Sequence, residues 1–334
     1  MAKCVIYVLK GIDYMNRNIK PMLSAHDLVE KLKTQKGIKF ENMSEQEAED
    51  YFLNVNNYLR TASYRKNFSK YECGTNRGKY INLDFACLKD LSSIDFHLRE
   101  IILKICIDIE HDLKIQLLKD IESHGLDGYS IVDNFLEENY FIINEIASKR
   151  TSAYTADLID KYFVFVRDAA GKRIVDSYDC PIWVLVEILS FGEFIKLYEF
   201  YYKSVEGPID PKLLHSVKSL RNACAHNNCL IYDLHTGNSK ASSLIKREIS
   251  RIEGLSKDSR KKRLSSRFIM EFVTLLYVHK KVTSCKIRTK RAQELLDLFE
   301  NRMKRHQDYY KDNDLLMSSY KFLYTIIKSW YTGV

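Results

Sequence analysis

The chain has 334 residues, with 52 Lys and Arg against 44 Asp and Glu, and hence a formal net charge of +8. Its 12 glycines and 4 prolines are too few for the many turns of a sandwich, a barrel or a doubly wound sheet. Because 46% of the residues are apolar, the composition also excludes a disordered chain, and we expect a mildly basic, all-α protein.

The sequence shows no export or membrane signal. The apolar run from Val5 to Leu9 is too short for the core of a signal peptide. No stretch of about 18 apolar residues occurs, so no spanning helix and no membrane partner are predicted. The eight cysteines are scattered and form no CxxC pair, and we therefore expect a reduced, cytoplasmic protein.

In the first half of the chain, capping boxes and apolar periodicity predict three helices. Two of them, over residues 25–35 and 45–59, begin where a serine precedes a carboxylate by three residues. The third runs from Ile94 to Ile121, where apolar residues recur with helical spacing. On its charged face we expect two pairs at i,i+4, namely Asp95 with Arg99 and Glu110 with Lys114.

In the second half, Pro181 precedes an apolar helix in which Trp183 is expected in the core and Glu187 is expected to pair with Arg99. A capping box at Ser190 begins another helix. Asp210 and Pro211 begin a further one, whose predicted buried stripe is Leu213, Leu214, Val217, Leu220 and Cys224.

The character of the chain changes near residue 238. A basic stretch follows, and then helices are predicted near residues 265–282, 288–304 and 313–330. We therefore expect a helical domain over residues 1–238 and a basic helical extension over residues 239–334 that packs on it.

The residues best suited to chemistry lie in one short stretch. Arg221, Asn222 and His226 fall within six residues, and on a helix Asn222 and His226 share a face. No Asp or Glu occurs between Pro211 and Tyr232, which argues against a carboxylate-held metal. Arginine binds phosphate bidentately and histidine transfers protons near neutral pH, so an acid-free site of this kind favours phosphodiester chemistry, with the 2′-OH of RNA as nucleophile.

Two other interpretations of this stretch stay open. Arg221 and His226 also suit the C-terminus of a helix, where cations interact with the last carbonyls. Alternatively, Cys224, His226, Cys229 and His235 offer soft ligands for zinc, although their spacing matches no standard ligand pattern. We predict no metal and no cofactor.

The stretch resembles the R-N-x3-H signature of HEPN ribonucleases, within a pattern similar to the Abi-like (abortive phage infection) family. The resemblance covers about residues 18 to 235 in the family's order: Lys20 to Leu32, Val55 to Phe68, Asp95 to Glu110, Pro181 to Gly192, and Leu220 to Asn228. Three positions depart from it: Asn57 stands where a tyrosine is usual, Asn227 replaces a second histidine, and Lys114 replaces an arginine.

The resemblance implies an all-α, HEPN-type helical bundle, here with additional N-terminal and C-terminal helices. It implies a metal-independent endoribonuclease that serves as a toxin or antiphage effector, and in some relatives a structured small RNA restrains the protein. Arg221, Asn222 and His226 are the expected catalytic residues, with possible support from Asn227 and Glu110. Because transesterification benefits from a base and an acid, and each chain has one motif imidazole, we expect a homodimer with a composite site.

Two groups of residues are candidates for binding the RNA substrate, namely Asn57, Tyr58, Arg60 and Tyr64, and the basic run Arg260, Lys261, Lys262 and Arg263. Packing at a helix end explains the first group nearly as well, and a solvated linker explains the second. The alternative function is a non-catalytic RNA-binding module that holds a small structured RNA. Cleavage that persists in EDTA and leaves 2′,3′-cyclic phosphate ends distinguishes the enzyme from this module.

Overall fold

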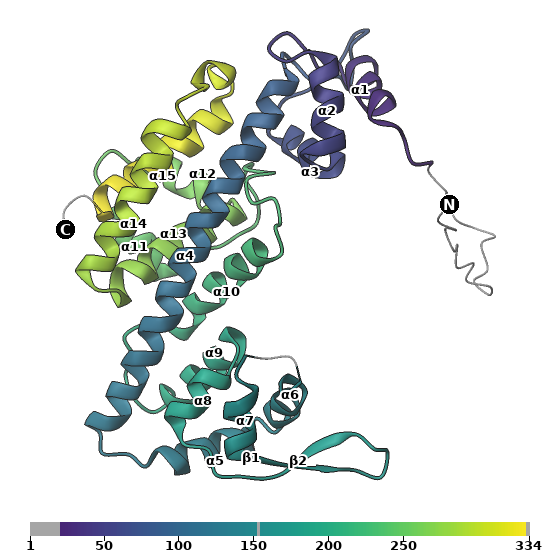
Figure 1. The fold of residues 1–334 in the computed structure, drawn as a ribbon. Coiled ribbons are helices and arrows are strands. Elements are labelled where there is room, and N and C mark those ends of the chain that lie inside the picture. Colours follow the sequence, from purple (N-terminus) through teal and green to yellow (C-terminus); the bar gives the residue numbers. More distant parts are fainter. Residues whose placement is uncertain (1–20, 152–153, 332–334) are drawn as a thin grey trace, which may run out of the picture. The chain divides into compact units, whose positions relative to one another are not determined.

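The computed structural model describes residues 21–151 and 154–331, so the run from Val5 to Leu9 lies outside the described residues. The structure is 65% helical, and the sheet found among the described residues has two strands, which confirms the all-α class (Figure 1). The chain forms two compact units. Residues up to 58 and 70–85 form the first, and residues 59–69 and 86 onward form the second.

The first unit contains α1 (Ala25–Thr34), α2 (Glu45–Asn54) and the first residue of α3 (Tyr58–Ser63). Both predicted capping boxes are present, at Ser24 and at Ser44. The helix expected over 45–59 is interrupted, because α2 ends at Asn54 and α3 begins at Tyr58. A cluster of aromatic rings forms much of the core: the ring of Phe85 contacts those of Phe40, Tyr51 and Phe52.

The second unit is built around α4 (Phe85–Ser123), which begins earlier than the predicted Ile94. The rest of α3 and a 3-10 turn, η1 (Tyr64–Asn67), precede it. Its apolar stripe is buried, as expected, at Leu98, Ile102, Ile105, Ile109, Leu113 and Leu117.

Both predicted ion pairs of α4 form, but in different surroundings. Glu110 and Lys114 lie 3.5 Å apart, as expected. Asp95 and Arg99 also pair, with 0% and 7% of their side chains exposed. The expectation that this second pair lies on a charged outer face is therefore wrong, because Asp95 faces the interior.

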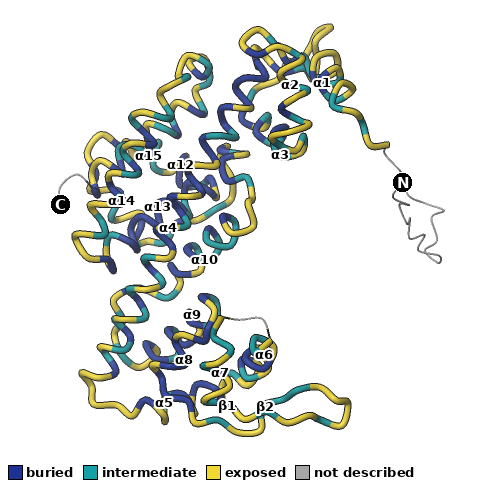
Figure 2. The backbone as a smooth tube through the Cα atoms, in the orientation of Figure 1, coloured by how far each residue is buried: buried dark blue, intermediate teal, exposed yellow. Residues whose placement is uncertain are grey.

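Further along the chain are α5 (Gly128–Glu138), α6 (Phe141–Lys149), α7 (Ala156–Tyr162), α8 (Ile182–Ile188) and α9 (Phe191–Tyr201). Between α7 and α8, β1 (Phe163–Arg167) and β2 (Arg173–Tyr178) pair antiparallel as a hairpin that the sequence analysis does not include. Val164 and Val166 are 55% and 42% exposed on it. Figure 2 shows the exposed tip of the hairpin in contrast to α8 and α9, most of whose residues are buried or half-buried.

Two expectations for α8 are wrong. Trp183 is 53% exposed, with its ring edge-on to that of Tyr129 on α5, so it is not a core residue. Glu187 is exposed as well, and Arg99 pairs with Asp95 instead. Both errors have one cause: α8 is short and buries one face, so residues four apart reach solvent together. The capping box at Ser190 is present at the start of α9, as predicted.

After α10 (Pro211–Ala225) come α11 (Ser243–Ser250), α12 (Lys257–Arg263), α13 (Arg267–Val282), α14 (Cys285–Asp297), the π-helical turn η2 (Leu298–Arg302), the 3-10 turn η3 (Gln307–Tyr310) and α15 (Asp314–Tyr331). Helix α13 packs against α10, α11 and α15, and most of its residues are buried (Figure 2). The second compact unit thus includes residues on both sides of 238, and the domain boundary at that position stays a prediction.

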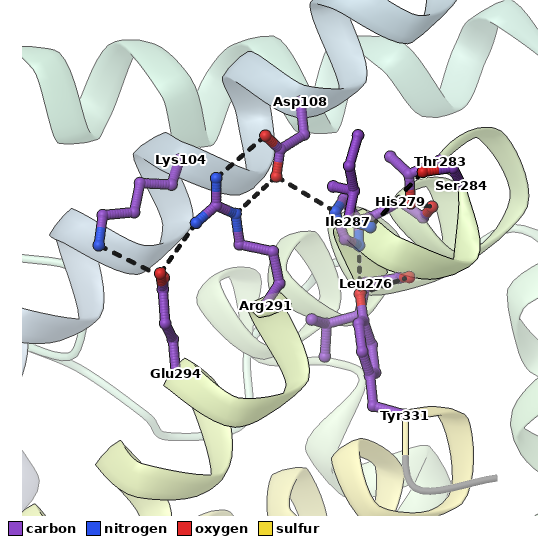
Figure 3. Close-up of polar contacts among 10 residues, drawn as sticks. All are labelled: Lys104, Asp108, Leu276, His279, Thr283, Ser284, Ile287, Arg291, Glu294 and Tyr331. Atoms are coloured by element: carbon purple, nitrogen blue, oxygen red, sulfur yellow. Dashed lines mark hydrogen bonds and ion pairs between the residues drawn. The ribbon is translucent and has the colours of Figure 1, made fainter. Parts of the chain in front are cut away.

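A polar cluster around the buried His279 joins α4 to the C-terminal helices (Figure 3). The guanidinium of Arg291 on α14 donates to both oxygens of Asp108, at 2.6 and 3.1 Å. On α13, His279 places its Nε2 3.5 Å from Asp108 Oδ2 and its Nδ1 2.8 Å from the hydroxyl of Tyr331. Burial alone would raise the pKa of Asp108, but the hydrogen bonds and charges of His279 and Arg291 lower it to about 2.

Candidate functional site

The R-N-x3-H motif lies at the C-terminal end of α10. This helix begins as predicted, with the Asp210 carboxylate accepting from the Lys212 amide at 3.0 Å and Pro211 in the first turn. All five residues of the predicted apolar stripe are buried. They hold α10 in the unit and leave the last residues of the motif exposed, because His226 is the C-cap of the helix and lies at the surface.

A Schellman turn follows His226. The amide of Asn227 donates to Cys224 O at 3.0 Å, and that of Asn228 donates to Ala223 O at 2.8 Å. Asn227 itself has φ +55°, in the left-handed region where Gly is most frequent and Asn next. The backbone conformation therefore gives Asn227 a structural role of its own, in the place where a second histidine is usual in the family.

Two arginines fix this turn from outside α10. Arg60, on α3, donates to the carbonyl of Asn227. Arg99, on α4, lies 3.4 Å from the carbonyl of Asn228. These two carbonyls follow directly on the end of α10, so cationic donors at this place also complement the negative end of the helix. The position of His226 is thus set from α3 and α4 as well as from its own helix.

The buried carboxylate of Asp95 holds the next residues of the chain. It accepts from the amides of Leu230 and Ile231, both at about 3 Å. It also accepts from the hydroxyl of Tyr64 at 2.8 Å and pairs with Arg99. Burial raises the pKa of Asp95 in spite of these partners. Asp95 therefore ties the loop after the motif to α4 and to η1.

Beside the end of α10 the surface forms an open polar pocket of about 670 Å³. Its walls come from α10, the loop after it, and the first turns of α13. The lining residues are Ser219, Leu220, Asn222, Ala223, His226, Asn228, Cys229, Leu230, Tyr232, Asp233, Arg267, Phe268 and Glu271. Asn222 and His226 thus lie on one wall, as their spacing predicts.

Arg221 does not line this pocket. It is half-buried on a different side of α10, close enough to the buried thiol of Cys106 on α4 to act on it electrostatically. Burial raises the pKa of that thiol, and the Arg221 charge opposes the rise. Within a single chain, therefore, the structure brings together Asn222 and His226 but not Arg221 and His226.

The pocket is not free of acids, in contrast to the segment around the motif. Glu271, one turn into α13, accepts from the Ser219 hydroxyl at 3.1 Å and from Arg267 at 3.0 Å. Arg267 also donates to the Ser219 hydroxyl at 3.0 Å. Asp233 is a second carboxylate in the lining. The acid-free site expected from the sequence is wrong, because the fold adds carboxylates that lie beyond the segment considered.

The residues of the first candidate RNA-binding group lie in different surroundings, and they do not form one surface in the structure. Tyr64 has no exposed surface and donates to Asp95, so it is a core residue and is not available to stack on a base. Arg60 belongs to the turn at Asn227. Asn57 and Tyr58 are in the first compact unit, where Asn57 is exposed and Tyr58 half-buried.

The four residues of the basic run on α12 also differ in how far they are buried. Arg263 is 5% exposed and donates to Ser319 at 2.9 Å, and burial lowers its pKa. It is therefore a structural residue and not part of an RNA-binding surface. Arg260 is half-buried, with its guanidinium 2.5 Å from Leu255 O. Lys261 and Lys262 are exposed.

Cys224, His226, Cys229 and His235 do not form a ligand set. In the part of the chain that the structure describes, no three His, Cys, Asp or Glu side chains gather closely enough to hold a metal ion. Cys224 is buried beneath the end of α10, and burial raises the pKa of its thiol to about 12. None of the described helices has the length and apolar content of a membrane span.

Three features of the pocket and its support are not predicted from the sequence: Tyr232 in the lining, the pairing of Arg267 with Glu271, and the use of Asp95 to hold the loop. The position of Tyr232 directly after the apolar pair Leu230 and Ile231 is a local signal for an exposed ring on a buried loop. No comparable signal exists for Glu271, which meets Ser219 only through the packing of α13 on α10.

The fold and the site define an all-α protein in which an R-N-x3-H motif ends a helix and exposes its histidine at a polar pocket. A family model described as Abi-like protein matches residues 51–232, just over half of the chain, and the chain belongs to this family. The matched range includes the motif, Asp95 and both arginines that hold the turn. No curated protein and no solved structure gives a significant match.

Proposed function

We propose that this protein is a metal-independent, HEPN-type endoribonuclease that acts as a toxin or abortive-infection effector. Membership of the Abi-like family supports the biological role. The observation that carries the chemistry is the exposed His226 on the wall of a pocket, held by a Schellman turn and two arginines. These contacts hold the backbone around His226, and an imidazole exposed at a pocket is suited to proton transfer.

In this proposal the 2′-OH of the substrate attacks the adjacent phosphorus. One imidazole removes the proton of the 2′-OH, and the P–O5′ bond breaks to leave a 2′,3′-cyclic phosphate. The departing 5′ oxygen takes up a proton from a second acid. Neither step requires a metal-bound water, because the nucleophile belongs to the RNA itself.

A second copy of the chain would supply the second imidazole. Since the pocket of one chain contains His226 but not Arg221, a composite site also gives Arg221 a partner histidine. Arg221 would then hold the phosphate and stabilise the charge that develops in the transition state. Asn222, on the same wall as His226, would orient the substrate or the imidazole. A small structured RNA that restrains the activity is compatible with the exposed Lys261 and Lys262.

The test is RNA cleavage by the purified full chain in EDTA, with the ends of the products identified. We expect 2′,3′-cyclic phosphate ends from the unsubstituted protein. His226→Ala is expected to lower the rate about 10²–10⁴-fold, the usual contribution of a general acid or base. His215→Ala is the matched control, because His215 is also exposed, pairs with Glu199 at 2.9 Å and does not line the pocket.

Circular dichroism and sizing of each variant separate lost chemistry from lost folding. Equal cleavage by His226→Ala and the unsubstituted chain would disprove the catalytic assignment. RNA binding by a pure dimer without any cleavage would favour the alternative, a non-catalytic module that holds a small RNA.

A further inference from the structure

Tyr232 presents an aromatic ring to the pocket that contains His226. Tyr232 lines that pocket, and the residue is 41% exposed although it lies between buried Ile231 and Leu234 in the same loop. The ammonium of Lys66 lies over the ring, 4.8 Å from its centroid. The ring is therefore placed beside a positive charge and near the candidate catalytic imidazole.

The loop that carries this ring is fixed on both sides. Before it, Asp95 accepts from the Ile231 amide at 3.1 Å. The buried side chain of Asn67 donates to Ile231 O at 2.8 Å and accepts from the Leu234 amide at 2.9 Å. With the carbonyl before Tyr232 and the amide after Asp233 both held, the ring is mounted on a rigid backbone. Such preorganisation reduces the entropy cost of binding.

We propose that Tyr232 is a stacking platform for one base of single-stranded RNA, adjacent to the scissile phosphate at His226. This inference rests on the proposed ribonuclease function and names the part of the substrate that the pocket holds. A tyrosine face stacks on any base, and a neighbouring cation attracts the phosphate backbone. An exposed ring in a polar pocket satisfies the first requirement, and Lys66 with Arg267 satisfies the second.

The carboxylates of the pocket favour guanine among the four bases. Asp233 and Glu271 both line it, and an ionised carboxylate only accepts hydrogen bonds. Guanine offers two adjacent donors, N1–H and N2–H, on its Watson–Crick edge. Adenine and cytosine each offer one amino donor beside a ring-nitrogen acceptor, so they give a carboxylate one hydrogen bond where guanine gives two. Uracil offers one donor between two carbonyl oxygens, and a carboxylate repels these oxygens. A base stacked on Tyr232 and read by a carboxylate is therefore expected to be guanine.

The experiment measures binding separately from cleavage. The His226→Ala chain is titrated into fluorescent ten-nucleotide oligouridines whose central residue is G, A, C or U, and polarisation is recorded. We expect the tightest binding for G. Adding Tyr232→Ala is expected to lower the affinity for the G oligonucleotide about tenfold. Tyr232→Phe is expected to change this affinity by no more than about twofold, because a phenyl ring still stacks. Asp233→Asn and Glu271→Gln, one at a time, are expected to narrow the preference for G over U.

The outcomes distinguish the two proposals. The platform is wrong and the ribonuclease stands if the unsubstituted chain cleaves RNA and the Tyr232 ring matters to neither step. In that outcome Tyr232→Ala binds like its His226→Ala parent and, made alone in the unsubstituted chain, cleaves at the full rate. If no cleavage occurs but binding depends on the Tyr232 ring, the ribonuclease is wrong and the platform stands. Absence of RNA binding, or equal loss in Tyr232→Phe and Tyr232→Ala, overturns the platform. Equal affinity for all four oligonucleotides overturns the preference for guanine.

Discussion

Two aspartates on α4, the buried Asp95 and the half-buried Asp108, use the same kind of side chain for different purposes. Asp95 accepts from the backbone amides of Leu230 and Ile231, as well as from Tyr64 and Arg99. Asp108 receives its donors from side chains of the C-terminal helices α13 and α14 (Figure 3). One cluster therefore sets the path of a loop, and the other joins helices.

The pKa values of the two carboxyls are shifted in opposite directions. Burial raises the pKa of Asp95 because its partners do not fully compensate for the loss of water. At Asp108 the contributions of His279 and Arg291 outweigh burial, and the pKa falls to about 2. Ionised Asp108 thus stabilises the fold, whereas ionised Asp95 is retained at some cost in stability. The carboxylate whose ionised form costs more free energy is thus Asp95, which holds the loop of the candidate site.

The largest effect is expected from Asp95→Ala. The change leaves Arg99 buried without its partner and two loop amides without an acceptor, so the free energy of unfolding should fall by about 3–5 kcal/mol. Asp108→Ala should cost less, about 2–3 kcal/mol, because Arg291 keeps Glu294 at 3.0 Å. Urea unfolding of both variants measures the difference.

Hydrogen exchange sharpens this comparison independently of any enzymatic activity. In Asp95→Asn, which keeps an acceptor oxygen and is the milder change, the amides of Leu230 and Ile231 should exchange faster than in the parent. In Asp108→Asn they should not change. Equal exchange at these amides in both variants would contradict the role assigned to Asp95.

The second prediction concerns pH and the Asp108 cluster. Burial lowers the pKa of His279 below its ordinary value of 6.5, in spite of Asp108. The folded state therefore binds this proton less well than the unfolded state does, and the stability from neutral His279 is full above about pH 6.5. It is lost as the pH falls below that value toward the lowered pKa. A second loss follows below about pH 4, as the pH approaches the pKa of Asp108, about 2.

The measurement is the thermal midpoint between pH 7.5 and 5 for the parent and for His279→Gln. Because glutamine does not titrate, the variant should lose less stability over this range, even if its midpoint is lower throughout. His215→Gln is the control for an exposed histidine, whose Nε2 lies 2.9 Å from Glu199. If His279→Gln retained the full slope of the parent, His279 would not be the titrating group.

Local signals in the sequence predict much of the fold. The capping boxes at Ser24, Ser44 and Ser190 fix helix starts, and the apolar stripe of α10 identifies its buried face. These signals depend on residues three or four apart. The hairpin and the division of the basic run depend instead on tertiary packing, which buries Arg263 against Ser319 on α15.

In the candidate site, too, the sequence predicts contacts between near neighbours on one helix but not contacts made by tertiary packing. The spacing of Asn222 and His226 places them on one wall of the pocket. No periodicity indicates that Asp95 holds an amide 135 residues away, or that Glu271 enters the pocket from α13. Both contacts join segments distant in sequence, and a buried carboxylate shows in the sequence only as a charge on a helix.

The smallest effect is expected at Asn227, where sequence and structure suggest different roles. Its φ of +55° suits glycine, so Asn227→Gly should change the free energy of unfolding by no more than about 0.5 kcal/mol. Asn227→Val should cost about 1–2 kcal/mol, because a branched side chain is strained in this region. If the residue acts only through its backbone, Asn227→Gly should cleave RNA at the parental rate. A loss of cleavage in a stable glycine variant would instead assign the Asn227 side chain to the reaction, in the place of the histidine that many relatives have there.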